Sequence, residues 1–204
     1  MNYKVNEIFS SLQGEGFFTG IPAVFVRLSG CNLKCPWCDT KHEEGKELTV
    51  EQIVSEINEA NEFNANLIVV TGGEPTNQQL EELLFGIKTS LVGKLITIET
   101  NGTQPEQLVY LKANGLLDFI TVSPKFNMLN DEVKASLAVA DEIKVVLDDK
   151  ATPDIYIPYI QGLIKHNRAY IQPCSENFAP AVKYVVENRC WRLGLQTHKI
   201  TKIQ

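Results

Sequence analysis

The strongest constraint on the fold of this chain is a short apolar run, rich in β-branched residues, that recurs every 23 to 28 residues from residue 67 onward. Short runs of this composition are typical of buried strands. An earlier run of the same kind begins the series. We therefore expect strands at residues 22–29, 67–71, 95–100, 119–122, 143–147, 169–172 and 192–196.

The segments between these runs have the apolar spacing of amphipathic helices. The clearest covers residues 49–63, where Thr49 and Gln52 form a capping box and Ile53 and Ile57 lie on one apolar stripe. Further helices are expected at residues 77–91, 130–139, 153–164 and 178–188.

Strands that alternate with helices form right-handed parallel βαβ units. Six to seven mostly parallel strands are too few for a closed eight-stranded barrel, so the expected fold is α/β, a partial (β/α) barrel. The N-terminal segment or a partner subunit would cover its open edge.

Composition limits the class of protein. A chain of 204 residues, 44% of them hydrophobic, can bury one core, and no Gly-, Ser- or Pro-rich linker divides it. We expect a single domain, with residues 1–21 as an N-terminal segment and residues 22–204 as the barrel core. The net charge of −6, without long single-sign runs, argues against nucleic-acid binding.

Targeting signals are not recognisable in the sequence. No apolar stretch approaches the ~20 residues of a membrane helix, and the N-terminus lacks the pattern of a secretory signal. We therefore expect no membrane partner and a cytoplasmic location. In that reducing compartment the five cysteines would not form disulfides.

The unusual residues of the sequence follow the expected strands. In parallel α/β folds ligands gather at the carboxyl ends of the strands, so the loops there should face one cavity. These loops are residues 30–40, 72–75, 101–102, 123–125, 172–173 and 196–199.

The first of these loops carries three cysteines. Three residues separate Cys31 from Cys35 and two separate Cys35 from Cys38, so one loop can wrap three thiolates around one inorganic centre. A 4Fe-4S cluster held this way keeps one iron open for a ligand. The alternative is a zinc site with His42 as fourth ligand.

The cysteine spacing, with Trp37 before the last cysteine, and the later Gly72-Gly73-Glu74 resemble the radical S-adenosylmethionine (SAM) enzymes. The resemblance implies that the open iron binds the amino and carboxylate groups of SAM. One electron from the cluster then cleaves SAM to methionine and a 5′-deoxyadenosyl radical. The backbone near Gly73 would hold the methionine end, where glycine permits close approach.

Five further segments resemble the 7-carboxy-7-deazaguanine synthase family: residues 11–16, Arg27, and residues 38–40, 71–75 and 123–125. The resemblance implies a lyase that contracts the ring of 6-carboxy-5,6,7,8-tetrahydropterin to 7-carboxy-7-deazaguanine and releases ammonia, for queuosine-type 7-deazapurine biosynthesis. It also implies Mg²⁺, a homodimer, and an electron donor such as flavodoxin or ferredoxin.

The family resemblance carries site residues with it. Residues 1–21 would be a substrate-binding segment, in which Gln13 offers an amide and Glu15 an acceptor for ring N–H groups, while Arg27 offers a fork to a carboxylate. The implied substrate-binding residues are Leu12, Gln13, Gly14, Glu15, Arg27, Thr71 and His198. Glu15, Arg27 and His198 among them would orient the substrate.

The resemblance assigns the cofactor residues in the same way. Cys31, Cys35 and Cys38 would hold the cluster, and Thr40 would bind Mg²⁺. The implied SAM-binding residues are Trp37, Gly73, Glu74, Ser123, Pro124, Lys125 and Gln172. Glu99 and Cys174 also follow expected strands, without an assigned role.

Two other functions fit part of the sequence. An activating enzyme that places a glycyl radical on a protein partner shares the three cysteines, but it should lack residues 11–16 together with Arg27. A zinc-binding interaction module would be colourless and independent of SAM.

Overall fold

The computed structural model describes residues 1–38, 40–175 and 177–203. These residues contain one nine-stranded sheet in the order β3-β1-β2-β4-β5-β6-β7-β8-β9. The strands are β1 Asn2–Leu12, β2 Pro22–Leu28, β3 Lys46–Thr49, β4 Leu67–Gly72, β5 Leu95–Thr100, β6 Phe119–Val122, β7 Glu142–Leu147, β8 Ala169–Pro173 and β9 Arg192–Leu193.

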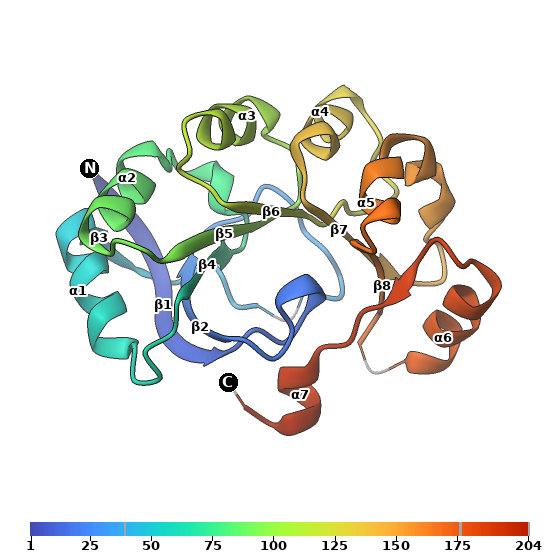
Figure 1. The fold of residues 1–204 in the computed structure, drawn as a ribbon, viewed down its shortest axis with the longest axis horizontal. Helices are drawn as coiled ribbons and strands as arrows, with labels where there is room; N and C mark the ends of the chain where they lie inside the picture. Colours follow the sequence, from blue (N-terminus) through green and yellow to red (C-terminus); the bar gives the residue numbers. More distant parts are fainter. Residues whose placement is uncertain (39, 176, 204) are drawn as a thin grey trace.

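The helices cover one side of this sheet. The sheet is curved, and α1 to α6 lie on its outer, convex side, whereas the short helix η1 lies inside the curve (Figure 1). The α-helices are α1 Val50–Ala60, α2 Glu81–Ser90, α3 Pro105–Ala113, α4 Asp131–Val139, α5 Gln161–Lys165, α6 Phe178–Glu187 and α7 Thr197–Thr201. The 3-10 helices are η1 Gly16–Phe18, η2 Pro75–Asn77 and η3 Pro153–Tyr159.

The parallel part of the sheet confirms the prediction of an open, partial barrel. β2 pairs with β4, and β4 to β9 then pair in parallel in chain order. Only β9 is clearly shorter than the expected strand at residues 192–196. The residues after Leu193 leave the sheet for the cavity, where the Gln196 side chain reaches Glu15.

The structure contains two strands, β1 and β3, that the sequence pattern did not predict. β1 pairs with β2 antiparallel, and β3 pairs with β1 antiparallel. The sequence pattern missed β1 because about half of its residues are polar and its middle residues are only partly buried, so apolar and polar residues do not alternate regularly along it. The N-terminal segment thus extends the sheet, and the four-residue β3 forms its short edge.

The helix boundaries largely agree with the sequence pattern. Thr49 caps α1 with the expected reciprocal capping box, and Asn130 caps α4. The expected helix at 153–164 is instead η3 followed by α5, because Pro158 lacks the N–H that a continuous α-helix needs. α2 begins later than expected, after η2.

The two faces of the sheet differ in chemistry because side chains alternate along each strand. On β4, β5 and β7 the outward residues, such as Ile68, Ile98 and Val145, are buried in the large core against the helices. The inward residues at the same level are polar. They include Arg27, Thr71, Glu99, Lys144 and Gln172, which all line one cavity.

An aromatic layer lies below these polar residues inside the curve. Phe9 stacks on Phe25 at 5.0 Å between ring centroids, and Phe18 packs edge-on against Phe119 at 4.9 Å. Residues 13–21, which join β1 to β2, therefore pack against an apolar layer. In the described ranges, no helix is long and apolar enough to cross a membrane.

Candidate active site

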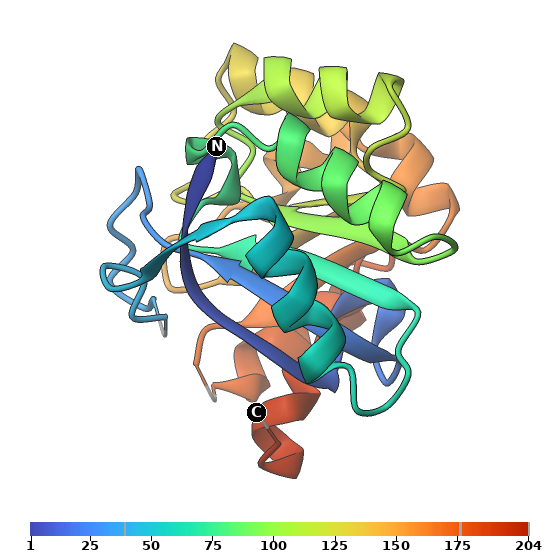
Figure 2. The same cartoon turned by 90° about the vertical axis from the view of Figure 1, so that its left-hand side faces the viewer.

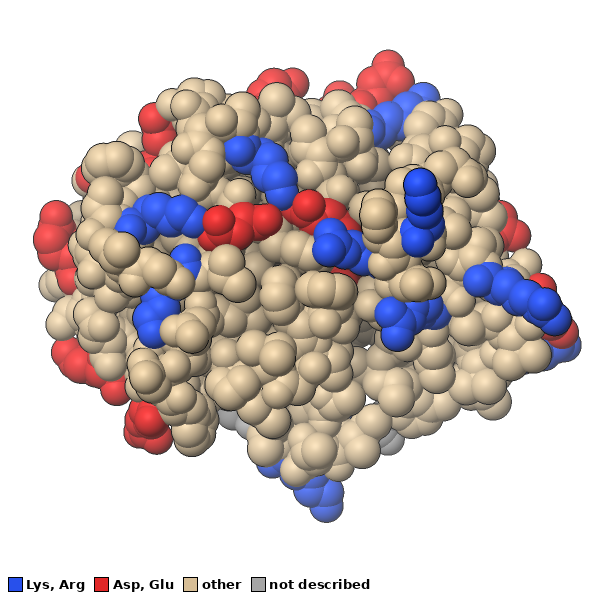
Figure 3. Space-filling model, in the orientation of Figure 1, with Lys and Arg blue, Asp and Glu red and all other residues tan. Residues whose placement is uncertain are grey.

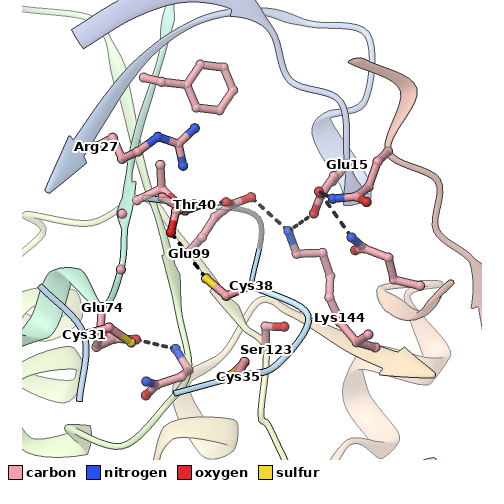
Figure 4. A pocket seen from close by; sticks show the side chains of 18 of the residues that line it. Glu15, Arg27, Cys31, Cys35, Cys38, Thr40, Glu74, Glu99, Ser123 and Lys144 are labelled. Atoms are coloured by element: carbon pink, nitrogen blue, oxygen red, sulfur yellow. Dashed lines mark hydrogen bonds and ion pairs between the residues drawn. The ribbon is translucent and has the colours of Figure 1, made fainter. Parts of the chain in front are cut away.

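The inner face of the sheet encloses a cavity of about 760 Å³. Figure 4 shows the three cysteine side chains on one side of it and Glu15 and Lys144 on the other. The loop that joins β2 to β3 and carries the cysteines projects beyond one end of the sheet (Figure 2). The cavity thus combines a cysteine side, built by one loop, with a charged side, built by separate strands.

Lys144 is the centre of the charged side. Its Nζ donates to Glu15 Oε2 at 2.6 Å and to Glu99 Oε1 at 2.9 Å (Figure 4). The side chains of Lys144 and Glu15 are only 6% and 15% exposed, so this ion pair is largely shielded from water. Such shielded, hydrogen-bonded charges hold a fixed geometry.

The charges of Glu15, Glu99 and Lys144 determine which of these side chains carry a proton. Burial alone would raise the pKa of Glu15, but the Lys144 ammonium outweighs burial and lowers that pKa to about 2. Burial opposes the charge on Lys144, yet Glu15 and Glu99 raise the pKa of Lys144 well above its usual value. At neutral pH Glu15 is therefore a carboxylate that accepts hydrogen bonds, and Lys144 keeps its proton.

Polar side chains from four other places in the sequence complete this network. Gln172 and Gln196 both donate to Glu15 Oε1, at 3.2 and 2.9 Å. Gln13 donates to Glu99 Oε1 at 3.2 Å, and Thr71 donates to Glu99 Oε2 at 3.1 Å. Gln13, Glu15 and Thr71, which the sequence assigned to one substrate, thus meet in one hydrogen-bonded group.

Arg27 lies next to the aromatic layer inside the sheet. Its Nε donates to Glu7 Oε1 at 2.7 Å, and its guanidinium lies 5.6 Å from the Phe9 ring centroid. The side chain is 21% exposed and lines the cavity. Glu7 and Phe9, both on β1, thereby orient a guanidinium that can bind a carboxylate.

The cysteine loop is held in place from two sides. Asn6 on β1 donates to the carbonyls of Lys41 and Glu44. Asn101, at the end of β5, donates to Asn32 Oδ1 at 2.9 Å. Cys31, Cys35 and Cys38 all line the cavity, and burial raises the pKa of the Cys31 and Cys35 thiols. Metal binding at these thiols would release protons.

The Gly72-Gly73-Glu74 turn lies against the start of the cysteine loop. A Cβ on Gly73 would lie 2.2 Å from the Gly30 carbonyl oxygen and 2.9 Å from Cys31 Cβ. Only glycine therefore allows this approach between the end of β4 and the end of β2.

Glu74 is buried in a hydrogen-bonded environment that the sequence did not indicate. Its carboxylate is 1% exposed and accepts bonds from Thr76 N and Oγ1, Thr100 Oγ1 and Asn101 N. Burial raises its pKa against these hydrogen bonds. The carboxylate thus ties the glycine turn to the end of β5, although Glu74 also lines the cavity.

Lys125 and Trp37 also line the cavity. Lys125 donates to Ser123 Oγ at 2.7 Å, and burial, with the charge of Lys144, lowers the pKa of Lys125. The Trp37 ring packs against Phe126 at 5.2 Å between centroids. The expected SAM-binding residues from the loop after β6 and from the cysteine loop are therefore neighbours.

Most of the expected site residues line this cavity. Leu12, Gln13, Glu15, Arg27, Thr71 and His198 do so from the substrate list, as do Trp37, Gly73, Glu74, Ser123, Lys125 and Gln172 from the SAM list, and Thr40. Gly14 and Pro124 stand outside this lining. Gly14 packs directly against His198, since a Cβ on Gly14 would lie 2.1 Å from His198 Nδ1.

Sequence reasoning missed Lys144 and assigned no role to Glu99 or to Gln196, although it expected the loop that begins at Gln196 to face the cavity. A signal for Lys144 exists, because a charged residue inside an apolar strand usually has a partner, and this argument applied equally to Arg27. Cys174, the other residue without a role, lines a second cavity of about 420 Å³. Asp39, within the quoted motif at residues 38–40, lies outside the described residues.

The cysteine loop fits an iron–sulfur cluster. The three thiols line one cavity, and thiolates are soft ligands that bind iron–sulfur clusters or zinc. A four-iron cluster spreads three thiolates over three irons. His42, the fourth ligand of the zinc alternative, stands outside the cavity lining.

Comparisons with known proteins identify the family of this chain. The model of the Radical SAM superfamily, which implies a 4Fe-4S cluster and SAM, matches residues 25–148. The 7-carboxy-7-deazaguanine synthase of Bacteroides thetaiotaomicron is 41% identical over 205 residues, with 100% of both chains covered. That of Escherichia coli (strain K12) is 34% identical over 233 residues, again with 100% of both covered.

A solved structure supports the same relationship over nearly the whole chain. The crystal structure of QueE from Escherichia coli aligns with a TM-score of 0.68 and 29% sequence identity, and the alignment covers 96% of this chain and 94% of that one. The chain belongs to the 7-carboxy-7-deazaguanine synthase family of radical SAM enzymes.

Proposed function

We propose that this chain converts 6-carboxy-5,6,7,8-tetrahydropterin into 7-carboxy-7-deazaguanine with release of ammonia. The observation that carries the proposal is the joining, in one cavity, of the three-cysteine loop with the Glu15–Lys144–Glu99 group and Arg27. One side suits a radical-forming cofactor pair, and the other suits a planar, hydrogen-bonding substrate with a carboxylate.

The charged side recognises the substrate. Glu15, fixed as a carboxylate by Lys144, accepts hydrogen bonds from ring N–H groups, and the Gln13 amide can pair with the ring edge. Arg27 binds the substrate carboxylate, and its place beside Glu7 and Phe9 sets the direction of the fork. Thr71 and His198 line the same volume.

The cysteine side holds the cofactors. Cys31, Cys35 and Cys38 would bind the cluster, while the Gly73 backbone, Ser123 and Lys125 would bind SAM beside it. When bound, these cofactors supply the radical chemistry that removes hydrogen from C6 of the substrate. The protein's own residues orient the substrate, exclude water and keep Lys144 charged.

Magnesium, the electron donor and the assembly state complete the proposal. Thr40 offers one hydroxyl to Mg²⁺, and the substrate carboxylate would complete much of the oxygen shell. An electron donor of the flavodoxin or ferredoxin type would reduce the cluster. We also propose a homodimer of single-domain chains, in which residues 1–21 serve the substrate.

The test is anaerobic reconstitution with iron and sulfide, followed by turnover of the pterin with SAM, reductant and Mg²⁺, with the product identified by mass. Product that depends on every component supports the proposal. A cluster that cleaves SAM without product would retain the radical chemistry and reject the substrate. A colourless protein that binds zinc tetrahedrally would favour the interaction module instead.

A further inference from the structure

Glu142 is a buried charged group that the proposed chemistry does not use. It begins β7, is 2% exposed, and lies outside the cavity lining. Its side chain points inward, two residues before Lys144 on the same strand, and therefore lies one layer below the Glu15–Lys144–Glu99 group. A carboxylate in such a place needs hydrogen-bond donors.

The turn that carries Glu15 supplies one of these donors. Phe17 N donates to Glu142 Oε2 at 2.6 Å, and Thr121 on β6 donates to Oε1 at 3.2 Å. A Cβ on Gly16 would lie 2.2 Å from Glu142 Oε1, so the glycine leaves the space that the carboxylate fills. Gly16 also has a φ of +65°, which favours glycine.

The substrate-facing residues come directly before the turn formed by Gly16–Phe18. Gln13 and Glu15 line the cavity, and the Gln13 side chain accepts a hydrogen bond from the Glu15 N–H at 3.1 Å. Below the turn, Phe17 stacks on Phe119 at 5.7 Å, and the Arg168 guanidinium lies 4.7 Å from the Phe17 ring. The Phe17–Glu142 bond ties the backbone of this turn to β7, in addition to the side-chain bond between Glu15 and Lys144 on the same strand.

We propose that Glu142 is a positioning residue for substrate binding, whose carboxylate anchors the Gly16–Phe18 turn and thereby fixes Gln13 and Glu15 against the pterin. The inference rests on the proposed function for the identity of the substrate. It assigns Glu142 no contact with substrate or cofactor. Its consequence is that substrate affinity, rather than the rate of the chemical step, depends on Glu142.

Protonation gives this role a measurable signature. Burial raises the pKa of Glu142 to about 7, against the charge of Lys144, and a neutral carboxyl is a weaker acceptor for the Phe17 N–H. Substrate binding should therefore weaken as the pH falls through 7. The other charged and titratable groups around Glu142 are Glu15 in the turn, Glu99 on β5, Lys144 on β7, and Arg168 and Tyr170 at β8.

The test compares wild-type holoenzyme with Glu142→Gln between pH 6 and pH 8.5, using turnover of the pterin and anaerobic calorimetry of its binding. At pH 8.5 we expect KM and Kd to rise about tenfold in the variant, the loss of one charge-assisted bond, with kcat changed less than about twofold. The wild-type increase in KM toward pH 6 should be absent in the variant.

Two matched variants and a second measurement keep the test decisive. Thr121→Val keeps the Phe17 bond and should raise KM only about twofold, and Glu106→Gln, on an exposed face of α3, should change nothing. Hydrogen exchange of a peptide covering residues 13–20 should accelerate in Glu142→Gln, which shows release of the turn without any turnover.

The inference and the proposed function fail differently. A wild-type enzyme without product overturns the function, while faster exchange in the variant would still support the anchored turn. A wild-type enzyme that makes product, with an unchanged KM, pH profile and exchange rate in Glu142→Gln, overturns the role of Glu142.

Discussion

The two sides of the cavity are built in different ways. The cysteine side comes from one continuous loop, with three ligands inside eight residues of sequence and two asparagine contacts that hold the loop from outside. The charged side comes from residues 13, 15, 99, 144, 172 and 196, which meet only in the folded sheet. We therefore expect changes on the first side to leave the fold intact, whereas the second side is part of the folded interior.

The face of the molecule drawn in Figure 3 is not a region of a single charge sign. On the face drawn in Figure 3, acidic and basic side chains lie next to one another. The concentrated charge of this protein is instead inside the curve of the sheet, at Lys144 and its two carboxylates. Variants of buried and surface charges should therefore behave very differently.

The largest effect is expected at the cysteine side. Cys35→Ser removes one thiolate ligand of the cluster, so we expect complete loss of product and of the brown cluster absorption, while the thermal unfolding of the unreconstituted protein stays unchanged. Cys190→Ser, at a half-buried thiol packed on the core, is the matched control and should retain cluster and product. Equal iron and sulfide content in Cys35→Ser and wild type would contradict this assignment.

The next effect concerns the charged side and changes stability itself. Lys144→Met leaves Glu15 and Glu99 facing each other without their shared cation, so we expect a loss of about 3–5 kcal/mol in the free energy of unfolding. Chemical denaturation measures it. Lys88→Met breaks an ion pair in which both side chains are about one-third exposed, and it should cost only about 0–1 kcal/mol.

The pH dependence of stability sharpens the same prediction. The folded pKa of Glu15 is lowered to about 2, so its contribution is present above the unfolded pKa and is lost as the pH falls toward 2. Wild-type stability should therefore fall more steeply below pH 5 than that of Lys144→Met, in which Glu15 has lost its cation. Parallel acid curves for the two proteins would show that Lys144 does not control Glu15.

The same contrast explains what the sequence could predict. The strand spacing predicted all seven parallel strands, because buried strands and amphipathic helices have strong local periodicity. β1 and β3 escaped, since β1 is half polar and β3 has only four residues. The cysteine loop was recognisable because its ligands are neighbours in sequence.

The charged side was only partly predictable for the opposite reason. Gln13, Glu15 and Arg27 entered through family resemblance, whereas Lys144 is marked only as a charge inside an apolar strand and Gln196 only by its place in a loop after an expected strand. Their roles depend on register: Lys144 faces inward because its neighbours Ile143 and Val145 face the helices. Glu142 was missed in the same way, since the expected strand began one residue too late, at residue 143.

A smaller effect should separate the cofactor side from the substrate side. Gly73→Ala places a Cβ 2.2 Å from the Gly30 carbonyl oxygen, so the start of the cysteine loop must shift. We expect SAM affinity, measured by anaerobic titration of the reconstituted protein, to fall at least about tenfold, while pterin affinity changes less than about twofold. The control is Gly162→Ala on α5, where the new Cβ meets nothing within 4 Å.

An equal loss of pterin and SAM affinity in Gly73→Ala would mean that the two sides are not mechanically separate. In that case the shift at Cys31 would have to reach Thr71, which lies two residues before Gly73 on the same chain and donates to Glu99. Unchanged binding of both ligands would show that the loop tolerates the added methyl group.

The smallest effect is expected at Asn6, which connects β1 to the cysteine loop through the carbonyls of Lys41 and Glu44. Asn6→Ala removes two exposed hydrogen bonds, so we expect a loss of about 1 kcal/mol, confined to the loop. Hydrogen exchange should accelerate about fivefold in residues 40–45 and stay unchanged in residues 13–20. Asn114→Ala, which removes a comparable bond at the end of α3, is the control. Faster exchange in both segments would show that β1 couples the two sides of the cavity, because Asn6 and Gln13 belong to the same N-terminal segment.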